Sequence, residues 1–313
     1  MTDLQPSHRP AGHAASAAAS PSSAAISQTN RADRKALTKE LGLEAGYRLQ
    51  KFVLKSEHLH YGLFEPDIPV DISNLKAAQD RFLQRLVEAI PAGTKTILDV
   101  GCGSGKTAEY LIDKGYSVEC VSPGARLTAI ASARLGESAR MHYGRFEHLS
   151  FSGRYDLVLF SESFQYIPME AALEKCVAIL NPGGHILICD FFRTDREGDS
   201  PIRGGHSHSQ WSAIYPRYPL DLVLDRDITA ETAPIHDIAQ AFNQEVLKPL
   251  WDGAMLAAAA RWPLLTRFGR VIFRKEIGKM EKYRLSGRRN GEAFREFKVY
   301  KTYLFRVRVG ARS

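Results

Sequence analysis

A glycine-rich turn after an apolar run is the first feature of this sequence that can do chemistry. The run from Thr96 reaches Asp99, and Gly101, Gly103 and Gly105 follow at alternate positions. Glycine adopts the positive φ that a tight strand-to-helix turn needs. It also lets a ligand approach the backbone beside the positive end of the next helix. The turn therefore predicts a nucleotide-type ligand at the end of this strand.

The spacing of the glycines distinguishes between ligand classes that use such turns. The dinucleotide fingerprint GxGxxG needs its third glycine one position beyond Gly105. A phosphate-binding GxxxxGK[ST] loop would end at Gly105–Thr107, but Val100 stands where its first glycine is required. Neither an NAD-type site nor a P-loop is therefore expected.

Apolar runs alternate with amphipathic helices through the middle of the chain. Strands are expected at 96–100, 117–121, 155–160 and 185–190, and helices at 75–90, 106–114, 125–135 and 170–180. After Asp190 we expect a polar loop at 191–218, a short strand at 222–224, a helical region over 235–295 and a closing strand from Val299. Alternating buried strands and helices predict a parallel sheet covered on both faces.

Five segments, in order, resemble the motifs of class I S-adenosylmethionine-dependent methyltransferases, and in particular the branch that methylates tocopherol-like rings, sarcosine and sugars. They are HLHYGLF (58–64), ILDVGCGSG (97–105), YDLVLFSES (155–163), LNPGGHILI (180–188) and the stretch from DIT (227–229) to AP (233–234). The resemblance implies an α/β, Rossmann-like, seven-stranded, mostly parallel sheet whose last strand is reversed. It also implies S-adenosyl-L-methionine as cofactor, a helical lid insertion near the C-terminus and a small-molecule acceptor.

The same resemblance divides the chain into three parts. Residues 1–32, rich in Ala, Ser and Pro, are predicted to be a disordered tail, with an organelle transit peptide as the alternative. Residues 33–190 would form the donor-binding core with its N-terminal helices. Residues 191–313 would supply the acceptor lid, made of the 191–218 loop and the 235–295 helices, and the closing strands.

The resemblance assigns donor contacts residue by residue. Asp99 would orient the glycine loop, and the glycines at 101, 103 and 105 would let the methionine moiety approach the backbone. Tyr61 would line the methionine end of the donor, and Ser161 would contact it from the fourth strand.

Two donor contacts of the family are replaced in this chain. Ser122 stands at the end of the second strand, where the family has an acid for the ribose hydroxyls. Arg145 stands where an aspartate would meet the adenine amino group, and arginine cannot accept a hydrogen bond. Glu147 or the backbone amide of Phe146 is expected to take that contact.

Three residues are candidates for work on the acceptor. Glu162 ends a buried strand and would serve as a general base or hold a cationic acceptor; a structural acid is the alternative. His60 could orient acceptor or donor, and Tyr166 could contact the acceptor, although core packing would explain either. Gln165 stands where many relatives have histidine, so a histidine base is not expected.

The predicted lid indicates a hydrophobic or amphipathic acceptor. Its large apolar residues are Phe191, Phe192, Trp211, Trp251 and Trp262. Trp211 and Tyr215 would form an aromatic wall for the acceptor. His206 and His208 have no third ligand at a recognisable spacing, so no metal site is predicted.

The net charge of +7 is unevenly distributed. Residues 261–313 hold 16 Lys and Arg against 4 Glu and no Asp, a net charge of +12. Such a segment is typical of an anionic substrate, a membrane surface, nucleic acid or only a solvated helix face. Arg284, Arg288 and Arg289 surround a turn and are expected to come closest to an acceptor.

Two alternatives to a small-molecule methyltransferase remain open from the sequence: a nucleic-acid methyltransferase and a non-catalytic donor-binding protein. The base-flipping motif of the former is replaced by SESF at 161–164, so nucleic acid is not the expected partner. The four cysteines lack metal spacing and no apolar run approaches the roughly 20 residues of a membrane span, which together favour a cytoplasmic enzyme. The oligomeric state stays open.

Overall fold

The computed structural model describes residues 31–275, 277–278 and 286–310. The chain divides into two compact units, residues 1–42 and residues 43–313. In the first unit, the described residues from Arg31 to Gly42 are helical and form the beginning of α2 (Arg31–Leu54). The predicted tail at 1–32 lies outside the described residues, except for Arg31 and Ala32, which are helical.

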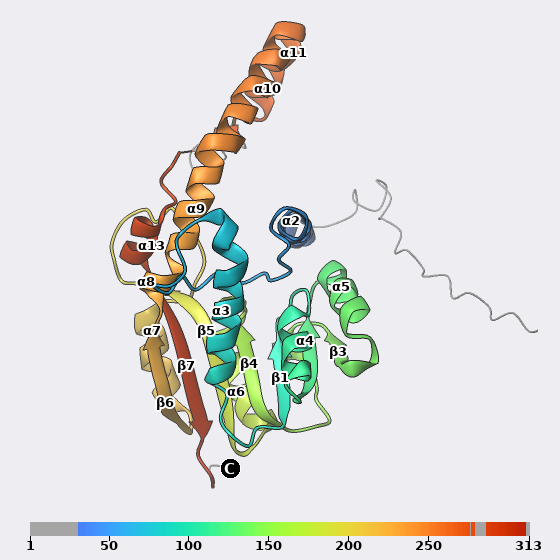
Figure 1. The fold of residues 1–313 in the computed structure, drawn as a ribbon, viewed down its shortest axis with the longest axis vertical. Helices are drawn as coiled ribbons and strands as arrows, with labels where there is room; N and C mark the ends of the chain where they lie inside the picture. Colours follow the sequence, from blue (N-terminus) through green and yellow to red (C-terminus); the bar gives the residue numbers. More distant parts are fainter. Residues whose placement is uncertain (1–30, 276, 279–285, 311–313) are drawn as a thin grey trace, which may run out of the picture. The chain divides into compact units, whose positions relative to one another are not determined.

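A seven-stranded sheet organises the second unit (Figure 1), in the order β3-β2-β1-β4-β5-β7-β6. The strands are β1 (Thr96–Val100), β2 (Ser117–Ser122), β3 (Arg140–Tyr143), β4 (Tyr155–Ser161), β5 (Leu180–Arg193), β6 (Leu220–Asp227) and β7 (Lys298–Val307). Strands β1 to β5 pair in parallel, and β7 is antiparallel to both β5 and β6. The predicted mostly parallel sheet with a reversed last strand is confirmed.

Helices cover both faces of this sheet, as predicted. On one face lie α3 (Leu75–Glu88), α4 (Lys106–Asp113) and α5 (Ala125–Leu135), whose Phe82, Leu111 and Leu135 join a buried cluster with Leu187 of the sheet. On the other face, α6 (Met169–Ile179) and α7 (His208–Ile214) pack on residues such as Phe305. The two clusters follow from the alternation of side chains along each strand.

The structure differs from the sequence expectation at β3 and within the 191–218 segment. Strand β3 was not predicted, because its four residues RMHY carry no buried alternation. The 191–218 segment is not a loop throughout: β5 extends to Arg193, and α7 and the 3-10 helix η5 (Tyr215–Arg217) follow. Helix α7 is too short to show a helical period, and it is held by burial of Trp211 and by Ser207, which caps it by accepting a bond from the Gln210 amide.

The described part of the region before β7 is mostly helical, with a non-helical stretch at 286–290. It contains α8 (Thr229–Thr232), α9 (Pro234–Phe242), the π-helix η6 (Asn243–Leu247), α10 (Lys248–Arg261), α11 (Pro263–Ile272) and α13 (Gly291–Phe297). Short 3-10 helices η1 (Ile72–Asn74), η2 (Gly136–Ser138), η3 (Phe146–His148) and η4 (Phe164–Tyr166) occur earlier. None of the helices in the described ranges is long and apolar enough to cross a membrane. The four cysteines are buried and unbridged.

Candidate functional site

The glycine turn joins β1 to α4, where the sequence placed it. Gly101, Gly103 and Gly105 have φ values of 81°, 57° and 77°, which a residue with a Cβ rarely adopts. A Cβ on Gly101 would also lie 2.4 Å from Ser163 Cβ. On Gly105 it would lie 3.2 Å from the Cα of Ala131 in α5. Gly105 therefore serves the packing of α4 against α5, and not only the approach of a ligand.

Two buried side-chain oxygens at the strand ends lack partners among the described residues. They are Asp99 Oδ2 at the end of β1 and Ser161 Oγ at the end of β4, the strand beside it. Burial raises the pKa of Asp99 to about 7. A buried polar atom without a hydrogen bond is costly, so these two positions are suited to a polar ligand. Asp99 makes no hydrogen bond to the glycine turn, so its predicted orienting role finds no support.

The segment from Glu57 to Phe64 lies over this turn. Ser104 Oγ donates to the Glu57 carbonyl at 2.8 Å, and Leu59 packs within 3.1 Å of the place where a Gly103 Cβ would stand. The Arg134 guanidinium, 2.8 Å from the Glu57 carboxylate, holds the pKa of that carboxyl down at about 2. The HLHYGLF segment is thereby fixed next to the ligand-binding edge of the sheet.

Glu162 stands one residue beyond β4 in a strained conformation, with a φ of 56°. Its Oε1 accepts hydrogen bonds from the Tyr61 amide at 2.6 Å and from the Tyr300 hydroxyl at 2.8 Å. Its Oε2 accepts none from the described residues. Desolvation, with a contribution from the Asp190 carboxylate, raises the pKa of Glu162 to about 8. A carboxyl with this pKa can take up or release a proton near neutral pH.

Asp190, which sequence reasoning did not select, is the second acid of the site. It is buried near the end of β5 and accepts bonds from the Gln165 amide at 2.9 Å and the Gln165 side-chain nitrogen at 3.0 Å. Burial raises its pKa to about 7. Gln165 thus holds an acid and does no acid–base work. The signal that selected Glu162, an acid closing a buried strand, was also present at Asp190.

Aromatic rings surround Tyr61 beside these acids. Ring centroids lie 5.3 Å away for His236 of α9, 6.0 Å for Phe294 of α13, 5.7 Å for Tyr300 of β7 and 6.1 Å for Phe191. Only Phe191 was expected near the acceptor. The others come from distant parts of the chain, and nothing local in the sequence marks them. Helices α9 and α13 therefore border this site.

The structure places His60 behind Tyr61 and away from an acceptor-facing position. One ring nitrogen shares a hydrogen bond with the Tyr61 carbonyl at 2.8 Å and the other with His58 at 3.1 Å. The ring also stacks on Phe82, and burial lowers its pKa to about 3. A neutral, fully engaged ring positions Tyr61 and is no proton carrier, so the predicted catalytic role of His60 is not supported by its contacts.

The residues predicted for the nucleoside end of the donor are all near strand ends. Ser122 is buried at the end of β2. The ring of Phe146 packs in the core against Phe160, so only its backbone can meet a ligand. Glu147 forms an ion pair with Arg145 at 2.7 Å, so its carboxylate is already engaged by the arginine.

Several predicted acceptor contacts lie elsewhere. Trp211 is fully buried against Phe164 and Phe192 on the opposite face of the sheet from Tyr300, so the expectation of an aromatic wall there is wrong. Tyr215 packs partly buried against the same cluster. His206 bonds to the carbonyls of η4 and its C-cap, whereas His208 bonds to a tyrosine of β7.

Two predicted acceptor contacts, Tyr166 and Arg289, are exposed and lie near the acids and Tyr61. Tyr166 is 54 % exposed, and desolvation with the nearby Asp190 and Glu162 charges raises its pKa to about 12. Arg289 is exposed, and its charge lies close enough to act on both Tyr61 and His236. Burial is the main influence on these two groups: it raises the pKa of Tyr61 and lowers the pKa of His236. Arg288 instead pairs with Asp199 at 3.9 Å, and Arg284 lies outside the described residues.

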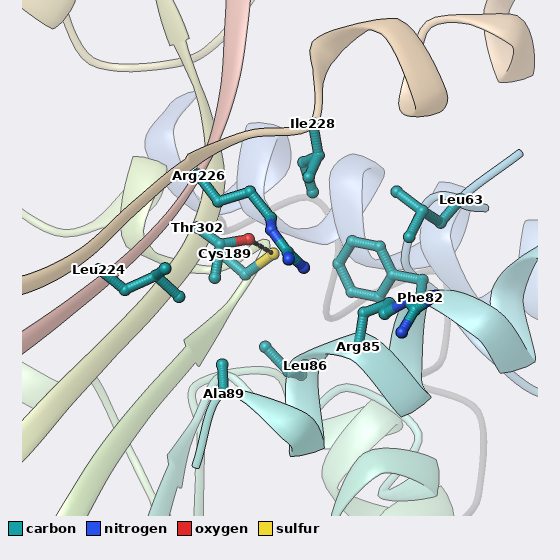
Figure 2. Close-up of a pocket in the computed structure, with 10 residues that line it drawn as sticks. All are labelled: Leu63, Phe82, Arg85, Leu86, Ala89, Cys189, Leu224, Arg226, Ile228 and Thr302. Carbon is teal, nitrogen blue, oxygen red and sulfur yellow. Dashed lines mark hydrogen bonds between the residues drawn. The ribbon is translucent and has the colours of Figure 1, made fainter. Parts of the chain in front are cut away.

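A small cavity lies on the α3 face, lined by side chains from α3, β5, β6 and β7 (Figure 2). Its volume is about 20 Å³, and Arg85, Arg226 and the Cys189–Thr302 pair border it. A space of this volume is large enough for one water molecule and too small for a metabolite, so this cavity is not the candidate site.

Comparison with known proteins defines the class to which this fold and site belong. The family model described as a methyltransferase domain matches residues 73–244, and the chain belongs to that family. A chloroplastic probable tocopherol O-methyltransferase of Oryza sativa subsp. japonica is 26 % identical over 231 residues, which cover 67 % of this chain and 62 % of that protein. The chain thus spans about three fifths of the length of this curated relative.

Two solved structures share the fold. The cyclase SpnF superposes with a TM-score of 0.58 at 16 % identity, covering 81 % of this chain and 89 % of that one. A geranyl diphosphate C-methyltransferase from Streptomyces coelicolor A3(2), in complex with Mg²⁺, geranyl-S-thiolodiphosphate and S-adenosyl-L-homocysteine, gives 0.57 at 15 % identity, covering 83 % and 91 %.

Proposed function

We propose that the protein transfers a methyl group from S-adenosyl-L-methionine to a small molecule with a hydrophobic or amphipathic body. The observation that carries this proposal is the edge formed by β1 and β4, where a GxGxG turn adjoins the buried, unpartnered oxygens of Asp99 and Ser161. Membership of the methyltransferase domain family supports it.

The residues at this edge fit the donor. Asp99 and Ser161 can hold polar groups of its methionine end, and Ser122 and the η3 backbone can meet its nucleoside end. When bound, the donor would supply a methyl group activated by its sulfonium, so that an acceptor atom in line with the C–S bond would take the methyl group and S-adenosylhomocysteine would leave. The protein's work is then to orient the acceptor and to manage its proton.

Glu162 is the group that we assign to the acceptor's proton. Tyr61 and Tyr300 hold Oε1 in place, which leaves Oε2 to receive a proton from a hydroxyl or amine. Burial, with a smaller contribution from the Asp190 carboxylate, raises the pKa of Glu162 to about 8 and so keeps this base near neutrality. Alternatively, the carboxyls of Glu162 and Asp190 would together hold a cationic acceptor.

The acceptor's body would lie against the half-buried Tyr61 and the exposed Tyr166. Phe191, His236 and Phe294 are buried and pack around the Tyr61 ring, with α9 and α13 as the cover. Aromatic walls with a few placed polar groups are typical of small-molecule sites. We further propose a cytoplasmic location, supported by four buried, unbridged cysteines.

Mass spectrometry of small molecules released from the purified protein tests the proposal. We expect S-adenosylmethionine or its demethylated product, together with any retained acceptor. Because the cyclase SpnF shares the fold, the fold by itself does not define the reaction. Release of NAD or ATP with neither sulfur nucleoside would overturn the proposal.

A further inference from the structure

Helix α11 presents an apolar face that nothing in the described part of the chain covers. Leu264, Leu265, Phe268, Val271 and Ile272 recur at the spacing of one helical face. All five are exposed, Leu264 by 82 % and Phe268 by 64 %, and neither α10 nor α11 contains a buried residue. In Figure 1 the two helices continue from α9 away from the sheet. A contiguous apolar face that is exposed over the length of a helix marks an interaction surface.

The other face of the same helix is basic. Arg270 lies opposite the apolar residues and Arg267 at the border of their face, and Arg261, Arg274 and Lys275 flank the helix. No acidic residue occurs between Asp252 and Glu276. None of the five cations forms an ion pair within the described residues. Trp262, 58 % exposed at the start of α11, adds an aromatic ring of the kind that settles at a membrane interface.

We propose that α11 binds to the surface of an anionic lipid bilayer, with its apolar face at the acyl boundary and its arginines at the headgroups. A basic helix with one apolar face lies in this way in a membrane interface. A second copy of the chain fits less well, because five unpaired cations on each copy would repel one another. Nucleic acid would use the arginines and leave the apolar face in water. The proposal is independent of the methyl-transfer reaction.

Flotation of the full chain with lipid vesicles tests the proposal. The probes are vesicles of phosphatidylcholine alone and vesicles in which about one third of the lipid is phosphatidylserine. We expect binding to the anionic vesicles that weakens with salt. The variant Leu264→Ser/Phe268→Ser should lose about tenfold or more in affinity, because several buried CH₂ equivalents are removed. The variant Arg267→Glu/Arg270→Glu should lose about 25-fold or more, since each surface charge contributes about fivefold.

The matched control is Val70→Ser/Val309→Ser, which removes two exposed apolar residues elsewhere on the chain. It should float as the unchanged protein does, and an unaltered melting temperature for every variant would show that each is folded. Failure of the unchanged protein to float, equal binding to both vesicles, or equal loss in the control would overturn the proposal. A dimer in solution that Leu264→Ser/Phe268→Ser dissolves, without vesicle binding, would overturn it in favour of a second copy.

Discussion

Replacing Glu162 by glutamine should make the stability of the protein less dependent on pH. The pKa of this carboxyl is raised from 4.5 to about 8. Between these values the folded protein holds a proton that the unfolded chain has released, so the stability of the unchanged protein falls as pH rises through this window. Glutamine cannot ionise, and its carbonyl oxygen can still accept the bonds from Tyr61 and Tyr300.

The magnitude follows from the pKa difference, at about 1.4 kcal/mol per unit. The ionisable Glu162 side chain costs about 2 kcal/mol at about pH 6 and about 4.5 kcal/mol at about pH 9. The stability of Glu162→Gln relative to the unchanged protein should therefore rise by about 2 to 3 kcal/mol between these two pH values.

Urea unfolding at the two pH values measures this difference. The control is Glu137→Gln, which changes an exposed glutamate of η2 and should leave the pH dependence as it is. If Glu162→Gln and the unchanged protein showed parallel stability curves, the carboxyl would ionise near its ordinary pKa, and the reasoning about a base poised near neutrality would be refuted.

Three further variants separate roles within the fold. Gly101→Ala should destabilise the protein by about 1 to 3 kcal/mol in urea unfolding, because its Cβ would stand 2.4 Å from that of Ser163 at a φ of 81°; unchanged stability would count against this. His60→Ala should cost about 1 to 3 kcal/mol through the lost hydrogen bond to Tyr61. Burial lowers the pKa of His60 from 6.5 to about 3, so the loss of stability in His60→Ala should be full above pH 6.5 and smaller in more acid solution. A loss of stability that grew in acid solution would contradict the neutral ring. Trp211→Ala should lower the free energy of unfolding by about 3 to 5 kcal/mol and leave the donor affinity measured by calorimetry unchanged. A folded variant with weaker donor binding would show that Trp211 belongs to the binding site.

The central strands were predictable because they are buried on both faces. The run Leu157–Phe160 has no polar residue, Ile97–Val100 has only the buried Asp99, and the LNPGG turn marks the start of β5. Strand β3 escaped prediction because its four residues include exposed ones at both ends. Helix α7 could not be predicted because two turns are too few to show a helical period. Its buried residue, Trp211, carries no local signal that distinguishes core packing from contact with a ligand.

The candidate site was predictable only where one segment carries the signal. The glycine turn and Glu162 are each marked locally, by spacing and by position after a strand. Tyr300 and Phe294 reach Tyr61 across more than 200 residues, and only the pairing of β7 with β5 brings them there. His60 could not be assigned from its type alone, because the burial that keeps its ring neutral and the bonds that hold the ring depend on how the segment from Glu57 packs.

Titration calorimetry with S-adenosylmethionine, S-adenosylhomocysteine, NAD and ATP tests the central claim most directly. We expect the two sulfur nucleosides to bind and the other two ligands to give no heat. Gly103→Val should abolish the binding, because a β-branched side chain resists the φ of 57° and meets Leu59. The matched variant Gly93→Ala, at an exposed turn where a Cβ has open space, should bind normally. Binding of ATP or NAD, with no response to either sulfur nucleoside, would contradict the claim.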